Sequence, residues 1–127
     1  MGAKSKNILV VEDDKSLSRI IVMKLKSAGY DVLLAENAEK GFEFLEKSIP
    51  DMIWLDVYLP GMDGFEFLTN LRSNDATKDI KVVSVSVSGS NRKAELAEKL
   101  GVSDYFVKSN YRIEELIELV TKIADSK

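Results

Sequence analysis

The chain has 127 residues, 45% of them hydrophobic, which is typical of one domain with one hydrophobic core. It contains no cysteine, which excludes disulfides and thiolate metal sites, and no histidine, which excludes a histidine-based triad or a phosphohistidine of its own. The net charge of −3 with mixed signs disfavours nucleic acid binding as the main role. There is no apolar signal region and no apolar run of membrane length, so we expect a cytoplasmic protein without a membrane span.

Short apolar runs alternate with longer amphipathic stretches from the start of the chain. The run NILVV at 7–11 predicts a fully buried strand. The stretch 15–29 carries apolar residues at helical spacing before a glycine that stops the helix. A second strand is expected at 31–35, followed by a helix through about residue 47 that Asn37 caps.

The middle of the chain continues this alternation. The run MIWLD at 52–56 predicts the third strand, and Pro60 and Gly61 suit a tight turn after it. Asp63 can cap a helix whose apolar positions are Phe65, Leu68 and Leu71. The run KVVSVS at 81–86 predicts the fourth strand.

The last part of the chain adds one more strand between two helices. A helix is expected around 94–100, where Gly101 ends it, and a fifth strand at 104–107. The last helix aligns apolar side chains from Ile113 to Ile123.

Five strands that alternate with five helices predict an α/β fold with a parallel sheet covered on both faces. Right-handed crossovers make this a doubly wound sandwich, in which ligands bind beyond the carboxyl ends of the strands. We expect residues 1–127 to form a single domain with a core from about 7 to 124.

Acidic residues follow two of the predicted strands. Glu12, Asp13 and Asp14 follow the first strand, and Asp56 ends the third. Neighbouring carboxylates a few ångströms apart repel by about 3 kcal/mol per pair at an effective dielectric near 20. Such a cluster either keeps a proton or takes up a cation, and oxygen ligands alone favour a hard ion, Mg²⁺ above all.

A hydroxyl and a lysine end the remaining strands. Ser86 ends the fourth strand and Lys108 follows the fifth, and this pair beside the acidic cluster suits an anionic group such as a phosphoryl on Asp56. Spacing alone does not choose among the alternating hydroxyls, which are Ser84, Ser86, Ser88 and Ser90.

Simpler structural roles also fit several of these residues. Asp14 and Asp63 suit helix caps better than metal ligands. Lys108 alone would be a solvated surface lysine, Tyr105 a half-buried strand aromatic, and Trp54 a core residue.

Three motifs together resemble the receiver domain of two-component response regulators, in its single-domain, chemotaxis-type form. The motifs ILVVEDD, LDVYLPGMDG and YFVK match in order and spacing, and the resemblance extends from about Asn7 to Ile123. It implies a flavodoxin-like three-layer sandwich with strand order 2-1-3-4-5.

The resemblance also implies the roles of individual residues. Glu12 and Asp13 would be the acidic pair and Asp56 the phosphorylated residue. Mg²⁺ would be held at this site by Asp13, Asp56 and the backbone carbonyl of Tyr58, with Glu12 beside them.

The switch residues implied by the resemblance come from the last two strands. Ser86 takes the place of the switch hydroxyl, and Lys108 that of the lysine that contacts the phosphoryl group. Tyr105 matches the aromatic residue that moves with the switch.

The chain departs from the family pattern at three positions. Val87 replaces the usual small residue after the hydroxyl, and Tyr58 is bulky at a position that tunes rates. Ser109 replaces the proline after Lys108, so we expect a trans Lys108–Ser109 bond and a different loop path, with Ser109 or Asn110 capping the last helix.

The resemblance implies a regulatory phospho-acceptor that assists its own phosphorylation and dephosphorylation, not an enzyme. A histidine kinase or histidine phosphotransfer protein would supply the phosphoryl group with Mg²⁺ present. Output would pass to a downstream protein through the face of the helix around 94–100, the strand 104–107 and the last helix. The same face could form a transient homodimer, and we expect no direct nucleic acid binding.

Other function classes stay open at this point. A pseudo-receiver that binds partners without phosphorylation is supported only by Val87 and Ser109. An Mg²⁺-dependent phosphohydrolase is disfavoured because Tyr58 stands where such enzymes have a second aspartate. No glycine-rich phosphate loop follows the first strand, which disfavours a nucleotide-binding domain.

Overall fold

The computed structural model describes residues 6–59, 63–86 and 91–126. The predicted turn at Pro60 and Gly61 and the departure at Val87 lie outside these residues.

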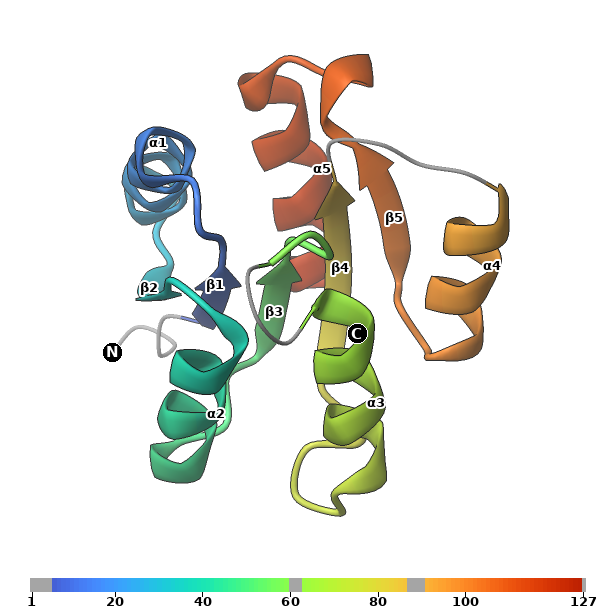
Figure 1. Cartoon of the computed structure of the whole chain (residues 1–127). Helices are drawn as coiled ribbons and strands as arrows, with labels where there is room; N and C mark the ends of the chain where they lie inside the picture. Colours follow the sequence, from blue (N-terminus) through green and yellow to red (C-terminus); the bar gives the residue numbers. More distant parts are fainter. Residues whose placement is uncertain (1–5, 60–62, 87–90, 127) are drawn as a thin grey trace.

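The strands form one parallel sheet in the order β2-β1-β3-β4-β5, which confirms the predicted topology (Figure 1). They are β1 (Asn7–Val11), β2 (Asp31–Ala35), β3 (Met52–Leu55), β4 (Lys81–Ser86) and β5 (Asp104–Val107). Apolar residues bury both faces of the central strands, as is usual in parallel sheets covered by helices.

The helices cover the two faces of the sheet. They are α1 (Lys15–Ser27), α2 (Ala38–Lys47), α3 (Gly64–Ser73), α4 (Asn91–Lys99) and α5 (Ile113–Asp125). Side chains of α1 and α5 join one hydrophobic cluster, and those of α2 and α3 join the cluster on the opposite face (Figure 1). The doubly wound three-layer α/β sandwich is therefore confirmed, and Trp54 is a fully buried core residue as expected.

Three helix caps match the sequence-based expectation. The side chains of Asp14, Asn37 and Asp63 each accept a hydrogen bond from the first turn of α1, α2 and α3. Asp14 Oδ1 accepts a hydrogen bond from the Leu17 amide at 3.0 Å, and Asp63 Oδ1 accepts one from the Glu66 amide at 2.9 Å. Such caps satisfy amide groups that otherwise lack partners at a helix start.

Several element ends differ from the prediction, and α4 begins at Asn91 and ends at Lys99 instead of spanning about 94–100. Helix α1 ends at Ser27, because Ala28 is already the C-cap and Gly29 takes a positive φ of 100°. Strand β3 ends at Leu55, although the Asp56 amide still donates to the Val11 carbonyl at 3.0 Å. Asp56 thus stands just past the strand with its backbone held by β1.

The loop before α5 follows a path that the sequence predicted only in part. Lys108–Asn110 forms a 3-10 turn, and the described residues contain no cis peptide bond, which confirms a trans Lys108–Ser109 bond. The predicted cap by Ser109 or Asn110 is wrong. Arg112 is the N-cap, and its amide donates to the Glu115 side chain at 2.9 Å, so the cap comes from inside the helix.

Candidate functional site

The carboxyl ends of four neighbouring strands bring the predicted residues to one edge of the sheet. Val11 of β1 pairs with Leu55 of β3, so Glu12 and Asp56 leave adjacent strands at the same level. Ser86 ends β4 and pairs with Val107 of β5, directly before Lys108. The predicted gathering at this edge is therefore observed.

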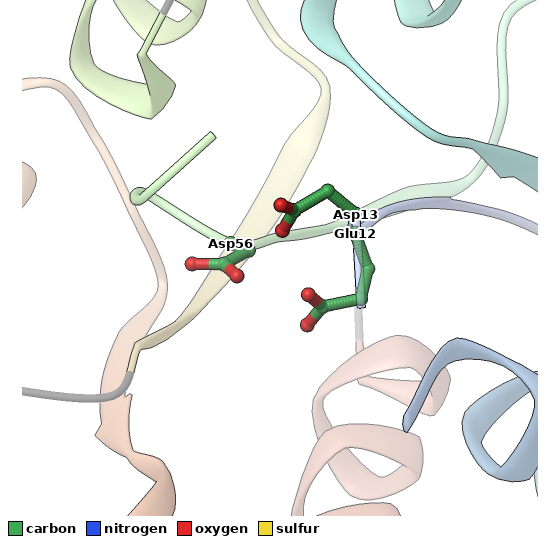
Figure 2. A group of neighbouring side chains, drawn as sticks. All are labelled: Glu12, Asp13 and Asp56. Atoms are coloured by element: carbon green, nitrogen blue, oxygen red, sulfur yellow. The ribbon is translucent and has the colours of Figure 1, made fainter. Parts of the chain in front are cut away.

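Three carboxylates form the centre of this site. Figure 2 shows Glu12, Asp13 and Asp56 pointing toward one another, with one oxygen of each within 4.8 Å of the others. Glu12 is 1% exposed and Asp56 is 3% exposed, whereas Asp13 lies open to solvent. Three convergent hard oxygen donors, one of them accessible from solvent, fit Mg²⁺ well because this ion prefers carboxylates and retains several waters.

Lys108 joins the two buried carboxylates. Its ammonium group donates to Glu12 Oε1 at 2.9 Å and to Asp56 Oδ2 at 3.2 Å. Lys108 is therefore not a solvated surface lysine. It supplies one positive charge against two buried negative ones, so the buried group keeps a net negative charge when both carboxyls are ionised.

The pKa values of the two carboxyls reflect this incomplete compensation. Burial raises the pKa of Glu12 to about 7, and the nearby Asp56 charge adds to the shift while Lys108 opposes it. Burial likewise raises the pKa of Asp56, opposed by Lys108. The pKa of Lys108 is raised, because its hydrogen bond to Glu12 and the charges of both carboxylates outweigh its own burial.

We predict that Glu12 makes the stability of the metal-free protein fall with rising pH. The carboxyl has a pKa of about 7 in the folded state against an ordinary value of 4.5, so the folded state binds the proton more tightly. Its contribution is most favourable below pH 4.5 and is lost as the pH rises through 7. Urea unfolding between about pH 5.5 and 8 should show this slope, and Glu12→Gln should flatten it. An equal slope in Glu12→Gln would assign the pH dependence to other groups.

Asp56 is held in place by backbone contacts on both sides. The Tyr58 amide donates to Asp56 Oδ1 at 2.9 Å, which leaves the other oxygen toward Lys108. Beyond Asp56 the chain approaches α3, where the Gly64 amide donates to the Val57 carbonyl at 2.9 Å.

Gly64 is a site residue that the sequence-based reasoning missed. A Cβ at this position would lie 2.3 Å from Val57 Cα and 2.9 Å from the Asp56 carbonyl oxygen. Only a residue without a side chain lets the start of α3 pack against the segment that carries Asp56. The motif LDVYLPGMDG contained the signal, but its meaning depends on how closely two segments approach in space.

The hydroxyls of β4 lie at different depths. Ser84 pairs with Leu55 inside the sheet, and its hydroxyl is buried with no hydrogen-bond partner in the described structure. Ser86 is two residues closer to the carboxyl edge and is fully buried there. Ser88 lies outside the described residues. Tyr105 of β5 is half-buried and pairs with Ser84.

Known proteins share this fold and sequence pattern. Residues 8–121 match the family described as response regulator receiver domain. The DNA-binding dual master transcriptional regulator RpaA of Synechocystis is 34% identical over 113 residues, which cover 89% of this chain and 46% of that protein. The chain spans about half the length of the curated relatives it matches.

Two solved structures resemble the whole fold. The Mn²⁺-bound form of response regulator Rcp1 has 29% identity and a TM-score of 0.80, covering 93% of this chain and 91% of that one. The phosphorylated cyanobacterial phytochrome response regulator RcpA has 29% identity and a TM-score of 0.82, covering 94% of this chain and 91% of that one.

The sheet order defines the chain as a doubly wound, flavodoxin-like α/β domain with an acidic cluster at the carboxyl edge of its sheet. Its match over residues 8–121 goes further: the chain belongs to the response regulator receiver domain family of two-component systems. Among the described residues, no helix has both the length and the apolar character needed to span a membrane.

Proposed function

We propose that the chain accepts a phosphoryl group on Asp56 from a phosphohistidine of a histidine kinase or histidine phosphotransfer protein. The observation that carries this proposal is the buried Asp56 carboxylate at a strand end, bonded to Lys108 and facing Glu12 and Asp13. A carboxylate oxygen would attack phosphorus, the bond from phosphorus to the imidazole nitrogen would break, and an acyl phosphate would form. The imidazole leaves with the electron pair of that bond.

The same residues suit a metal-assisted transfer. Asp13, Asp56 and the Tyr58 carbonyl would hold Mg²⁺, with Glu12 beside them. The bound ion would supply charge neutralisation for the phosphoryl oxygens. The chain's own residues orient the acceptor, since the Tyr58 amide and Lys108 fix one oxygen of Asp56 each.

Lys108 and Ser86 would sense the new phosphoryl group. Lys108 already donates a hydrogen bond to Asp56. Its ammonium can donate to a phosphoryl oxygen on the same residue without leaving the site. Ser86 at the end of β4 would donate a hydrogen bond from its hydroxyl to another phosphoryl oxygen, and Tyr105 would move with it. The face of α4, β5 and α5 would then bind a downstream protein or a second copy of the chain. In this proposal residues 1–127 act as one regulatory domain in the cytoplasm.

The test is phosphorylation by acetyl phosphate, followed by intact-mass measurement. The mass should rise by one phosphoryl group with Mg²⁺ and stay unchanged with EDTA. No labelling in Mg²⁺ would instead support a pseudo-receiver. Steady hydrolysis of p-nitrophenyl phosphate would support a phosphohydrolase and contradict the proposal.

A further inference from the structure

Helix α4 has little hydrophobic attachment to the rest of the domain. Of its side chains at 94–99, which are those that the structure describes, only Ala97 is buried. Leu96 is 41% exposed. In contrast, α3 buries Phe67, Leu68 and Leu71 completely. Leu100 and Val102, directly after α4, are partly buried and pack against the cluster of α2 and α3, so the helix is attached mainly at its C-terminal end, where a further interaction is found.

Arg72 at the end of α3 supplies that interaction. Its Nε donates to the Leu100 carbonyl at 2.7 Å and its Nη2 to the Gly101 carbonyl at 3.1 Å, both directly after α4. Its Nη1 donates to the carbonyls of Lys78 and Ile80 at 2.8 Å each, in the loop before β4. One planar guanidinium thus links the end of α4 to the body of the domain.

The geometry at the end of α4 fits this contact closely. Gly101 has a φ of +76°, and a Cβ there would lie 3.4 Å from Arg72 Nε. The positive φ favours glycine at this turn, and the guanidinium lies at ordinary van der Waals distance from such a Cβ. A cation at this place also interacts favourably with the negative end of the helix dipole.

The end of α5 is fixed in a similar way. The Lys81 ammonium donates to the carbonyls of Ile123 and Ser126 at 2.8 and 2.7 Å, and the Lys6 ammonium donates to the Ala124 carbonyl at 2.8 Å. These contacts come from the amino ends of the strands, at the opposite edge of the sheet from Asp56.

We propose that Arg72 is a positioning residue that makes the C-terminal end of α4 a fixed pivot. This inference rests on the proposed phosphorylation of Asp56. When the site is loaded, α4 tilts about Leu100 and Gly101, and its displacement grows toward the helix start. Arg72 therefore sets how a change at Asp56 is converted into a new orientation of α4.

The test compares backbone amide NMR spectra with and without beryllofluoride, a phosphoryl mimic, in the presence of Mg²⁺. In the parent protein, amides of Ala94–Ala97 should shift more than those of Leu100–Val102. In Arg72→Gln, the shifts should extend to Leu100–Val102. Arg72→Lys should resemble Arg72→Gln, because an ammonium cannot reproduce the planar fork of four hydrogen bonds. Arg19→Gln, at an exposed arginine of α1, serves as the matched control and should resemble the parent.

Hydrogen exchange gives a second measurement without the mimic. The Gly101 and Val102 amides donate to the Glu98 and Ala97 carbonyls, so loss of the guanidinium should speed their exchange on the order of tenfold. Amides of β1 and β3 should keep the parental rates, which separates local release from general unfolding.

The outcomes separate the two proposals. Shifts near Asp56 with equally large shifts at Ala94 and Leu100 in the parent would overturn the pivot alone. Unchanged exchange at Gly101 and Val102 in a folded Arg72→Gln would also overturn it. Absence of any shift near Asp13 and Asp56 would instead reject the proposed function.

Discussion

Replacing Asp56 by asparagine should abolish phosphorylation while leaving the domain at least as stable as the parent. The amide has no carboxylate oxygen to attack phosphorus, so intact mass should stay unchanged after incubation with acetyl phosphate and Mg²⁺. The asparagine side chain can still accept the Tyr58 amide that now bonds Asp56 Oδ1 at 2.9 Å. The fold around the site should therefore persist.

The stability gain follows from the charges at the site. Glu12 and Asp56 share one compensating cation, Lys108, and both are almost fully buried. The Asp56→Asn substitution leaves one carboxylate with one ammonium, so the unfolding free energy at neutral pH should rise by roughly 1–3 kcal/mol. Asp63→Asn, which retains a helix cap, is the matched control and should label like the parent. Full labelling of the Asp56→Asn protein would place the acceptor elsewhere.

Gly64→Ala should be among the most damaging small substitutions in the domain. The new methyl group would lie 2.3 Å from Val57 Cα, so the backbone beside Asp56 has to move. We expect a loss of about 2–4 kcal/mol in unfolding free energy, the cost of an overpacked contact against backbone. Phosphorylation should slow by roughly tenfold or more, because a small misplacement of the acceptor carboxylate is costly.

Gly41→Ala provides the comparison for Gly64→Ala. A Cβ at Gly41 would lie 3.1 Å from Phe67 Cε2, a contact that a displacement of a few tenths of an ångström relieves, and alanine favours the helix. Its stability should change by less than about 1 kcal/mol, with parental labelling. Denaturant unfolding and phosphorylation rates are to be measured for both variants. Equal losses of unfolding free energy and of phosphorylation rate in Gly64→Ala and Gly41→Ala would contradict the steric argument.

The sequence predicted features that depend on local chemistry. Alternating apolar runs placed the five strands, and the short polar side chains Asp14, Asn37 and Asp63 marked helix starts. The gathering of acidic residues and a lysine at one edge also followed, because parallel strands send their carboxyl ends to the same side. The roles of these residues in phosphorylation stay predictions.

Features that depend on distances between remote segments could not be predicted. Gly64 matters because α3 approaches Val57, and Arg72 because the end of α4 lies within reach of its guanidinium. Neither of these two close contacts can be recognised from the spacing of residues in the sequence. The predicted cap of α5 by Ser109 or Asn110 is wrong because these residues lie in the 3-10 turn Lys108–Asn110, and α5 begins only at Ile113 with Arg112 as its N-cap.

The bond between Lys108 and Glu12 joins residues that are 96 positions apart, on strands separated by β3 and β4. This bond can form only after the strands from β1 to β5 along that edge have assembled in register. Contacts of such long sequence separation form late and slowly in folding. A nascent or partly unfolded chain therefore has Asp56 but no Lys108 beside it, so under the proposed function the ability to accept a phosphoryl group arrives only with completed folding.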